Sequence, residues 1–427
     1  MRVLWLCNIM LPVIADSLGL PASNKEGWLS GLAKWICKES LAEQEERVTL
    51  GVCFPAQKAL QGEAAGISYY GFVEDTIHPE RYDTVLEERL KYITEDFKPD
   101  IVHCFGTEYP HTLAMTRAFS KPQRTLIGIQ GLCFAYADAY MADLPQRICR
   151  RTLLRDFLKR DNLIMQQKKY RMRGEYEKEA LRGVCHVTGR TDWDRYFTEL
   201  INPAASYHFM NETLRAPFYG PRWLGEACEP YSIFVSQGNY PIKGLHYLLQ
   251  ALPEVLSKYK EAHVYVAGDK ITAYTTLKEK LKISNYGKYL RELLHQNQLE
   301  DKVTFLGRLN TEEMLGRYLK SQVFLSPSAI ENSPNSVGEA MLLGMPVISS
   351  DVGGVHNMLK NEEEGLLYKA DDIHALAECI CRVFSPQGYL KAVKMGERAR
   401  AHALETHDGE KNSRRLLEIY HEINLCI

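Results

Sequence analysis

The 427-residue chain lacks several features that mark whole classes of protein. No stretch approaches 18 uncharged apolar residues, so we expect no membrane-spanning helix. Eleven cysteines are scattered without any Cys-x2-Cys pair, which argues against a zinc site and favours reduced thiols in a cytoplasmic protein. The net charge of −2 gives no electrostatic reason to expect a nucleic-acid partner.

Two further patterns are missing near the N-terminus. The opening run MRVLWLCNIMLPVI has no cleavage pattern of a secretory signal, so residues 2–7 are interpreted as a buried first strand. A glycine-containing loop and the helical sequence WLSGLAKWICKESL follow, as in the first unit of a Rossmann-like domain. No Gly-x-Gly-x-x-Gly accompanies them, which disfavours a nicotinamide-dependent oxidoreductase.

Composition and length favour a soluble protein of two domains. Hydrophobic residues make up 45% of the chain and charged residues 25%, which is ordinary for globular proteins. Residues 204–230 are rich in proline, glycine and aromatic residues without a clear period, as in a linker. We therefore predict an N-terminal α/β domain at 1–215, a linker at 216–230, a second α/β domain at 231–386, and C-terminal helices at 387–427.

The most informative stretch is ENSPNSVGEAMLLG, which begins at Glu331 and includes Glu339 eight positions later. An apolar strand precedes it, and the helix that follows should begin at Asn335 and Ser336, place Glu339 in its first turn and end at Gly344. A helix N-terminus offers unpaired N–H groups and a positive dipole end, which suit a phosphate. Flanking carboxylates could accept hydrogen bonds from sugar hydroxyls, so the stretch fits a nucleotide sugar. A capped helix with a solvated Glu339 is the plain alternative.

This stretch resembles the signature of retaining family-4 glycosyltransferases of the GT-B fold. The matched positions are Glu331, Glu339, Ala340, Gly344, Pro346, Val347, Gly353 and Gly354. The resemblance implies two Rossmann-like domains facing a central cleft, with the last helix, after Pro386, crossing back to the first domain. It also implies transfer of a sugar, with retention, from a nucleoside diphosphate sugar to a hydroxyl, without a metal ion.

The resemblance assigns the catalytic and donor-binding residues. Glu331 would hold the transferred sugar, Glu339 the ribose, and Lys243 the diphosphate, although an exposed lysine at a helix start is the alternative for Lys243. The catalytic set is Glu331, Lys243 and Gln130. The further donor-binding set is Glu339, Asn335, Ser336, Val337, Gln237, Gly238, Gly307 and Arg308, with the amides of Ser336 and Val337 expected to contact the departing diphosphate.

The chain departs from the family at two places. Histidine is usual where Gln130 stands, and glutamine cannot titrate, which weakens any argument for a histidine base. This fits the family's chemistry, in which the leaving phosphate is thought to take the acceptor proton. Arginine is usual five or six residues before the family's lysine, where this chain has Gly238 and Gln237, so Lys243 would carry more of the diphosphate's charge.

Three residues are expected to line the acceptor side. Gly27 matches a glycine kept by the family near the reacting sugar, and His103 resembles the histidine of a Pro-Asp-Ile-Val-His motif. Arg190 follows a strand in a Thr-Gly-Arg-Thr segment. The plain alternatives are a glycine needed for helix packing and a histidine satisfied within the core.

Residues 147–173 carry ten Lys or Arg residues against two acids, with apolar residues between them. A basic amphipathic helix of this kind can lie on an anionic membrane surface, which would bring the protein to a lipid-linked acceptor at the inner face of the cell membrane. A solvated helix beside the acceptor site is the alternative.

The expected partners are a nucleotide-sugar donor and a glycan or lipid-linked acceptor, in bacterial cell-surface polysaccharide synthesis by analogy with the family. Two other functions remain open: a sugar-nucleotide epimerase or hydrolase of the same fold, and a sugar-nucleotide-binding protein with little or no catalysis.

Overall fold

The computed structural model describes residues 1–21, 27–42 and 48–425, and it divides into two compact units. Unit 1 comprises Met1–Ala135, Lys169–Ala216 and Thr406–Ile427, and unit 2 comprises Tyr136–Lys168 and Pro217–Glu405. Each unit is built on its own mostly parallel sheet, which confirms the predicted α/β fold with two Rossmann-like sheets. Residues 136–168 cluster with unit 2, although the sequence analysis had assigned them to the N-terminal domain.

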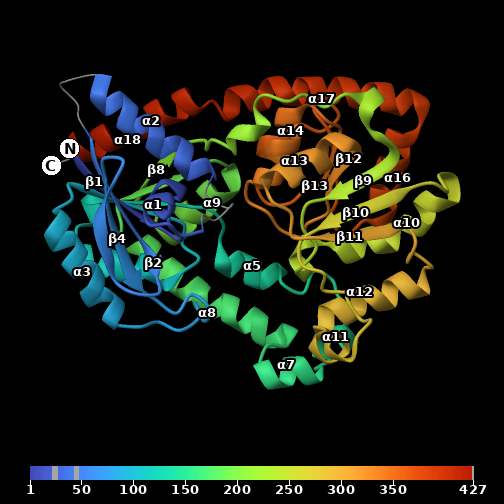
Figure 1. Ribbon diagram of the computed structural model, residues 1–427, viewed down its shortest axis with the longest axis horizontal. Helices are drawn as coiled ribbons and strands as arrows, with labels where there is room; N and C mark the ends of the chain where they lie inside the picture. The colour runs from blue at the N-terminus through green and yellow to red at the C-terminus, as the bar shows by residue number, and fades with distance from the viewer. Residues whose placement is uncertain (22–26, 43–47, 426–427) are drawn as a thin grey trace. The chain divides into compact units, whose positions relative to one another are not determined.

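Unit 1 contains an eight-stranded sheet in the order β3-β4-β2-β1-β5-β6-β7-β8 (Figure 1). Every neighbouring pair is parallel except β3 and β4, so β3 forms an antiparallel edge. The strands are β1 (Arg2–Cys7), β2 (Thr49–Ala56), β3 (Leu60–Ala64), β4 (Ile67–Val73), β5 (Ile101–Phe105), β6 (Thr125–Gly128), β7 (His186–Gly189) and β8 (Ser206–Phe209). The order reverses direction between β1 and β5, which is where open α/β sheets bind ligands.

The alternation of side chains along β1 explains how this sheet is covered on both faces. Val3 and Trp5 join one hydrophobic core, whereas Leu4 and Leu6 join the other. Helices on the first face include α1 (Pro12–Ser17), α2 (Gly27–Ala42) and α18 (Gly409–Leu425), and those on the second include α3 (Val85–Phe97), α4 (Pro110–Phe119), α8 (Leu163–Arg182) and α9 (Asp192–Ile201).

Unit 2 contains a six-stranded, fully parallel sheet in the order β11-β10-β9-β12-β13-β14. The strands are β9 (Glu229–Val235), β10 (His263–Ala267), β11 (Val303–Gly307), β12 (Ser321–Ser326), β13 (Val347–Ser350) and β14 (Leu366–Tyr368). The helices after them are α10 (Leu245–Lys258), α12 (Asn285–Gln296), α13 (Thr311–Lys320), α14 (Asn335–Leu343), α15 (Val355–Met358), α16 (Ile373–Phe384) and α17 (Pro386–Thr406). The reversal point of this sheet lies between β9 and β12.

The basic segment 147–173 does not form one helix, which corrects the prediction. It divides among α6 (Gln146–Arg150), α7 (Leu154–Lys159) and the start of α8. The break after α7 occurs at Arg160, whose φ of +49° is left-handed and ends the helix. The Asn162 side chain then accepts the Met165 N–H at 2.9 Å, as a cap does at a new helix start.

The C-terminal helix returns to the first unit, as predicted. α17 belongs to unit 2, but α18 packs against α2 and β5 within unit 1. The hydroxyl of Tyr420 on α18 accepts the Trp5 indole N–H at 2.8 Å, deep in the core. No helix within the described ranges combines the length and the apolar character needed to cross a bilayer.

Candidate functional site

The reversal point of the sheet in unit 2 gathers the residues of the predicted donor site. Lys243 lies in the loop after β9, and Glu331 lies in the loop after β12, the strand that pairs directly with β9. Because both strands are parallel, both loops emerge at the carboxyl edge of the sheet. Lys243 Nζ forms an ion pair with Glu331 Oε1 at 2.5 Å, and the Glu331 side chain is only 9% exposed.

A glycine allows these two loops to approach each other closely. Gly244 has a φ of +68°, and a Cβ at that position would lie 1.7 Å from the carbonyl oxygen of Pro327 in the Glu331 loop. The Ala329 N–H donates to the Ile242 carbonyl at 2.8 Å, so the two loops share a backbone hydrogen bond as well. The close approach requires glycine at position 244 and fixes Lys243 next to Glu331.

A second glycine turn supports Glu331 from the loop after β13. Gly353 has a φ of +55°, and its Cβ would lie 1.9 Å from the Glu331 carbonyl oxygen. The Gly354 N–H donates to that same oxygen at 3.2 Å. On the side-chain end, the Ser328 hydroxyl donates to Glu331 Oε1 at 2.8 Å. Glu331 is therefore positioned at both its backbone and its carboxylate.

Helix α14 begins at Asn335, as the sequence predicts, with Pro334 as its cap. The N–H groups of Val337 and Gly338 donate to the Pro334 carbonyl at 3.0 and 3.3 Å. The Val337 amide, which was predicted to face the diphosphate, is thus engaged inside the first turn. The amides of Asn335 and Ser336 precede the helix's own hydrogen-bond ladder and remain suited to an anion.

Glu339 is the fifth residue of α14. The helix begins at Asn335 as predicted, but the prediction that Glu339 stands in its first turn is wrong by one position. Its side chain is buried, with the residue 3% exposed. This excludes the plain alternative of a solvated surface glutamate, since carboxylates are seldom buried without a specific reason.

The other predicted donor residues lie along the same edge of this sheet. Gln237 and Gly238 follow β9, and a Cβ on Gly238 would lie 2.6 Å from the Leu245 side chain. Gly307 ends β11 with a φ of +88°. Arg308 is exposed and forms an ion pair with Asp269, which follows β10. The sequence analysis did not identify Asp269, although its place just beyond a strand end was a usable signal.

In unit 1, Gln130 and Arg190 meet at a buried glutamate that the sequence analysis missed. Arg190 Nη1 pairs with Glu212 Oε1 at 2.5 Å, and Gln130 Nε2 donates to the same oxygen at 2.5 Å. Burial raises the pKa of Glu212, and the charge of Arg190 opposes that rise. Within the described residues, Arg190 Nε and Glu212 Oε2 are buried without a hydrogen-bond partner.

His103 lies in the core of unit 1, as expected for a buried histidine with a hydrogen-bond partner in the core. It is fully buried on β5, and its Nδ1 is 2.7 Å from the Tyr420 hydroxyl. That hydroxyl also accepts a hydrogen bond from the Trp5 indole N–H, and among the described residues His103 Nε2 is buried without a hydrogen-bond partner. Desolvation lowers the pKa of His103 to about 3, so the ring is neutral near pH 7. Contact of His103 with an acceptor stays a prediction.

The reversal point of the unit 1 sheet holds a polar cluster that was not predicted. Asn8 follows β1 and Glu108 follows β5, and the Asn8 amide donates to Glu108 Oε2 at 3.3 Å. His111 on α4 bridges Asn8 Oδ1 at 3.0 Å and Glu74 Oε2 at 2.6 Å. Asn8 and Glu74 stand directly after strand ends, and Glu108 stands three residues after the end of β5. The rule that ligands bind beyond the carboxyl ends of parallel strands could therefore have found them.

Next to this cluster, Glu177 on α8 is buried and accepts hydrogen bonds from the Thr107 hydroxyl and, at 3.2 Å, from the Phe134 N–H. Desolvation raises the pKa of Glu177 to about 8, so this carboxyl is largely protonated at neutral pH. Gly27, the remaining predicted residue, begins α2, and its surroundings lie outside the described residues.

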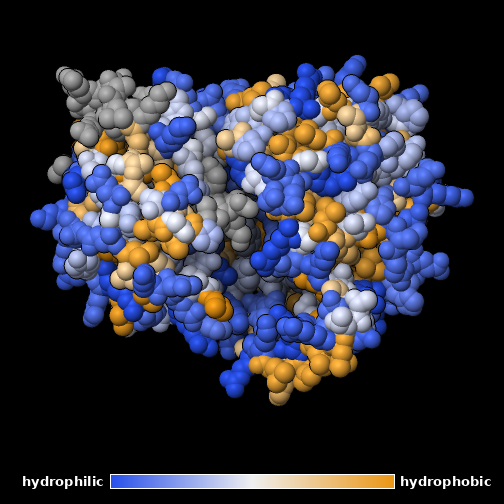
Figure 2. Space-filling view, in the orientation of Figure 1, coloured by the Kyte–Doolittle hydropathy of each residue, from blue (hydrophilic) through white to orange (hydrophobic). Residues whose placement is uncertain are grey.

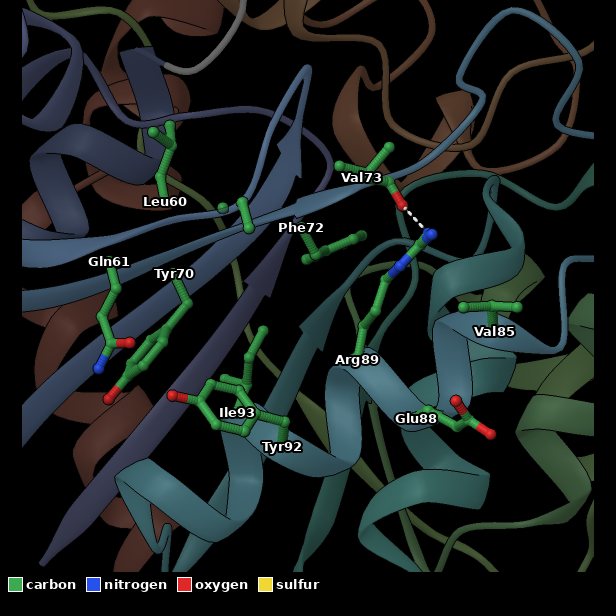
Figure 3. A pocket seen from close by; sticks show the side chains of 12 residues that line it. Leu60, Gln61, Tyr70, Phe72, Val73, Val85, Glu88, Arg89, Tyr92 and Ile93 are labelled. Carbon is green, nitrogen blue, oxygen red and sulfur yellow. Dashed lines mark hydrogen bonds between the residues drawn. The ribbon is translucent and has the colours of Figure 1, made fainter.

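A separate pocket of about 500 Å³ lies between β3–β4 and α3 in unit 1 (Figure 3). Tyr70, Phe72, Val85 and Tyr92 give it an apolar lining, and Arg89 donates to the carbonyl of Val73 at one end. None of the predicted site residues lines it. The described part of the chain also holds no group of three or more His, Cys, Asp or Glu side chains arranged to bind a metal ion.

A family model described as glycosyl transferases group 1 matches residues 229–385, which include Lys243, Glu331 and Glu339. This part of the chain is similar to the glycosyl transferases group 1 family. The match covers the donor-site loops of unit 2 and stops short of the unit 1 cluster.

The individual relatives of this chain are distant. A putative colanic acid biosynthesis glycosyltransferase of Escherichia coli is 33% identical over 166 residues, which are 38% of this chain and 37% of the relative. A GDP-mannose-dependent phosphatidylinositol monomannoside mannosyltransferase of Mycobacterium tuberculosis is 25% identical over 222 residues, 48% of this chain and 53% of the relative. The chain matches 37%, 41% and 55% of the lengths of three further relatives, so it spans about half the length of the curated proteins it resembles.

Solved structures match over nearly the whole chain. A sucrose-phosphate synthase from Thermosynechococcus elongatus has a TM-score of 0.68 at 15% identity and covers 99% of both chains. Anabaena HepE in complex with UDP-glucose has a TM-score of 0.64 at 15% identity and covers 99% of this chain and 100% of its own. At these identities the likeness shows the fold, which is GT-B.

Proposed function

We propose that this chain is a retaining glycosyltransferase that moves a sugar from a nucleoside diphosphate sugar to a hydroxyl of a glycan or lipid-linked acceptor. The observation that carries the proposal is the meeting of Lys243, Glu331 and the start of α14 at one reversal point. Lysine and unpaired helix amides suit a diphosphate, and a positioned carboxylate suits sugar hydroxyls.

The Lys243–Glu331 ion pair suggests how the donor enters. On binding, the diphosphate takes Lys243 as its counter-ion, and Glu331 is released to accept hydrogen bonds from the sugar. Lys243 and the amides of Asn335 and Ser336 then stabilise the negative charge that grows on the leaving diphosphate. Glu339 holds the ribose, and Gln237, Gly238, Gly307 and Arg308 line the rest of the donor.

The acceptor is assigned to unit 1. Gln130 contacts the transferred sugar, and Gly27, His103 and Arg190 belong to the acceptor side. The acceptor oxygen forms its bond to the anomeric carbon on the face from which the diphosphate leaves, and a phosphate oxygen takes the hydroxyl proton. Relatives named for colanic acid synthesis and for a phosphatidylinositol mannoside support a cell-surface glycan or glycolipid as the product.

The first experiment measures slow donor hydrolysis by the purified protein across UDP-, GDP- and ADP-sugars, with and without a chelator. Wild type should hydrolyse one donor, and chelation should leave the rate within about twofold because the protein itself supplies the positive field. Glu331→Gln should abolish hydrolysis, and Glu312→Gln, an exposed glutamate on α13, should not.

Other outcomes identify the competing functions. A donor that binds in calorimetry but is never turned over, even with glycan acceptors present, would make the protein a sugar-nucleotide-binding protein. A product that remains a free or epimerised sugar in the presence of every acceptor would favour an epimerase or hydrolase. Product NMR that shows inversion at the anomeric carbon would refute retention.

A further inference from the structure

Helix α7 has its polar and apolar faces exchanged relative to an ordinary surface helix. Its Asp156 is buried, with 2% exposure, whereas Leu154, Phe157 and Leu158 are 57%, 72% and 71% exposed. A helix on a soluble surface normally buries its apolar side chains and exposes its charges. Three large apolar side chains on a six-residue helix that point to solvent therefore call for a partner that covers them.

Buried hydrogen bonds fix this orientation. The Asp156 carboxylate accepts the backbone N–H groups of Leu153 and Asn285 at 3.3 and 3.2 Å. The Asn285 side chain, at the start of α12, donates to the carbonyls of Ile148 and Arg151 at 2.6 and 2.9 Å. Rotation of α7 to hide its apolar residues would leave these buried groups unsatisfied. The exposure is thus a property of the fold of unit 2.

A second short helix extends the apolar surface. Helix α11 (Leu277–Lys282) packs against α7 within unit 2, and its Leu277 and Leu281 are 75% and 52% exposed. Four residues apart on a helix, they share one face. We call these five side chains the apolar tip: Leu154, Phe157, Leu158, Leu277 and Leu281. Figure 2 shows hydrophobic side chains gathered at the lower edge of the view, where Figure 1 places α7 and α11.

The charges around the apolar tip are mainly positive. The exposed charged residues of α7, its cap and α11 are Lys159, Arg160, Lys278, Lys280 and Lys282. Of the acids in the same segments, Asp156 is buried, and Glu279 is the one accessible carboxylate, which accepts the N–H groups of Thr275 and Thr276 at 2.8 and 2.9 Å. Apolar side chains rimmed by lysine and arginine match a bilayer surface with anionic headgroups.

We propose that α7 and α11 form a membrane-docking surface that seats the apolar tip at the headgroup level of a bilayer containing anionic lipids. Charge complementarity favours this occupant over a second copy of the chain, since two tips would bring ten cations together. The proposal rests on the proposed function in one respect only: it selects a lipid-linked acceptor over a soluble one. It also moves the membrane contact from the whole segment 147–173 to α7 and to α11, which the sequence analysis did not include.

Flotation with vesicles tests the proposal directly. Wild type should float with vesicles of phosphatidylglycerol and phosphatidylcholine but poorly with phosphatidylcholine alone, and salt should weaken the binding. Replacing the three lysines of α11 by glutamine should weaken binding on the order of a hundredfold, given the usual attraction per basic residue. The variant Leu154→Ser/Phe157→Ser/Leu158→Ser should no longer float, whereas Ile77→Ser and Leu390→Ser, at exposed apolar positions elsewhere, should bind as wild type.

A tryptophan probe reports insertion itself. Phe157→Trp should show a blue-shifted emission with anionic vesicles and should be quenched by lipids brominated along their chains, while Leu390→Trp should show neither. Equal flotation of the triple serine variant and the wild type would overturn the proposal. So would a wild type that is a dimer without vesicles and a triple serine variant that is a monomer, because the tip would then be a self-association surface.

Failure of this proposal and failure of the proposed function are distinguishable. Hydrolysis of a soluble donor should be the same in wild type and in the triple serine variant, because the tip lies outside the Lys243–Glu331 site. The flotation of the two proteins therefore tests the membrane surface alone. The absence of donor hydrolysis in wild type would count against the transferase assignment alone.

Discussion

The carboxyl edges of the two sheets differ in how they treat charge. In unit 2 the reversal point combines a lysine, helix amides and a glutamate held by glycine turns. In unit 1 the reversal point holds Glu74, Glu108 and the Asn8–His111 link, with the buried Glu177 beside it. The first arrangement is preformed and offers a lysine and helix N–H groups, which suit a diphosphate. The second is rich in oxygen acceptors, which suits the hydroxyl groups of a glycan.

The same fold thus presents complementary chemistry at two equivalent places. Both edges follow the rule that ligands bind beyond the strand ends at a reversal of strand order. What differs is the set of residues that follows the strands: glycines and the pairs Lys243–Glu331 and Arg308–Asp269 in unit 2, and mainly acids and amides in unit 1. Four substitutions test this difference between the two edges.

The largest combined effect, on donor turnover and on stability together, is expected for Gly353→Ala. An alanine Cβ would lie 1.9 Å from the Glu331 carbonyl oxygen, and φ is +55°, so the turn must move and Glu331 with it. We expect a loss of donor turnover of at least about a hundredfold and a destabilisation of about 2–4 kcal/mol. The matched control is Gly316→Ala on α13, where no atom lies within 4 Å and alanine should stabilise the helix by about 1 kcal/mol. Thermal melts with parallel turnover assays check both variants. An active, stable Gly353→Ala would show that the turn at Gly353 does not position Glu331.

Lys243→Met should lower donor turnover by on the order of 10²–10³, the range seen when one stabilising donor is lost. It should also weaken binding of the free nucleoside diphosphate, whereas binding of the nucleoside alone should not change. Glu331→Gln provides the contrast, because it frees Lys243 from its ion pair and should leave diphosphate affinity undiminished while turnover is lost. Calorimetry with both ligands checks this, and unchanged diphosphate affinity in Lys243→Met would remove the lysine from the donor site.

Removal of one partner from the buried contact of Gln130, Arg190 and Glu212 in unit 1 is expected to act mainly on stability. Arg190→Met leaves Glu212 buried without its counter-ion, which costs about 3–5 kcal/mol in free energy of unfolding. The double variant Arg190→Met/Glu212→Gln should recover most of that loss, because no charge is left unpaired. Denaturant unfolding of the single and double variants measures the coupling. Additive losses would show that the pair does not act as a unit.

The sequence predicted the parts of these sites that are encoded locally. Apolar runs bounded by glycine and proline predicted the strands, and the spacing around Glu331 predicted the start of α14, whereas the donor-binding roles of its residues stay predictions. The partners of buried groups were beyond its reach. Glu212 and Glu177 contact Gln130 and Thr107, which lie 82 and 70 positions earlier in the sequence, only once the chain has folded. The same holds for α11, which joins α7 through tertiary packing and carries no membrane signal of its own.

The smallest effect is expected at Glu177, and it is a dependence on pH. Burial raises the pKa of this carboxyl to about 8, from the usual value near 4.5 in the unfolded chain. The folded state therefore holds a proton that the unfolded state releases, so the contribution of Glu177 to stability is complete below about pH 4.5 and is lost as pH rises through about 8. Glu177→Gln keeps a side-chain oxygen for Thr107 and Phe134 but cannot ionise, so its stability should fall less between pH 5 and pH 9, by about 1–3 kcal/mol. Glu175→Gln, an exposed glutamate on the same helix, should retain the wild-type pH profile. Denaturant midpoints across this range decide the matter, since identical profiles for wild type and Glu177→Gln would mean that the buried carboxyl is ionised and that its pKa is not raised.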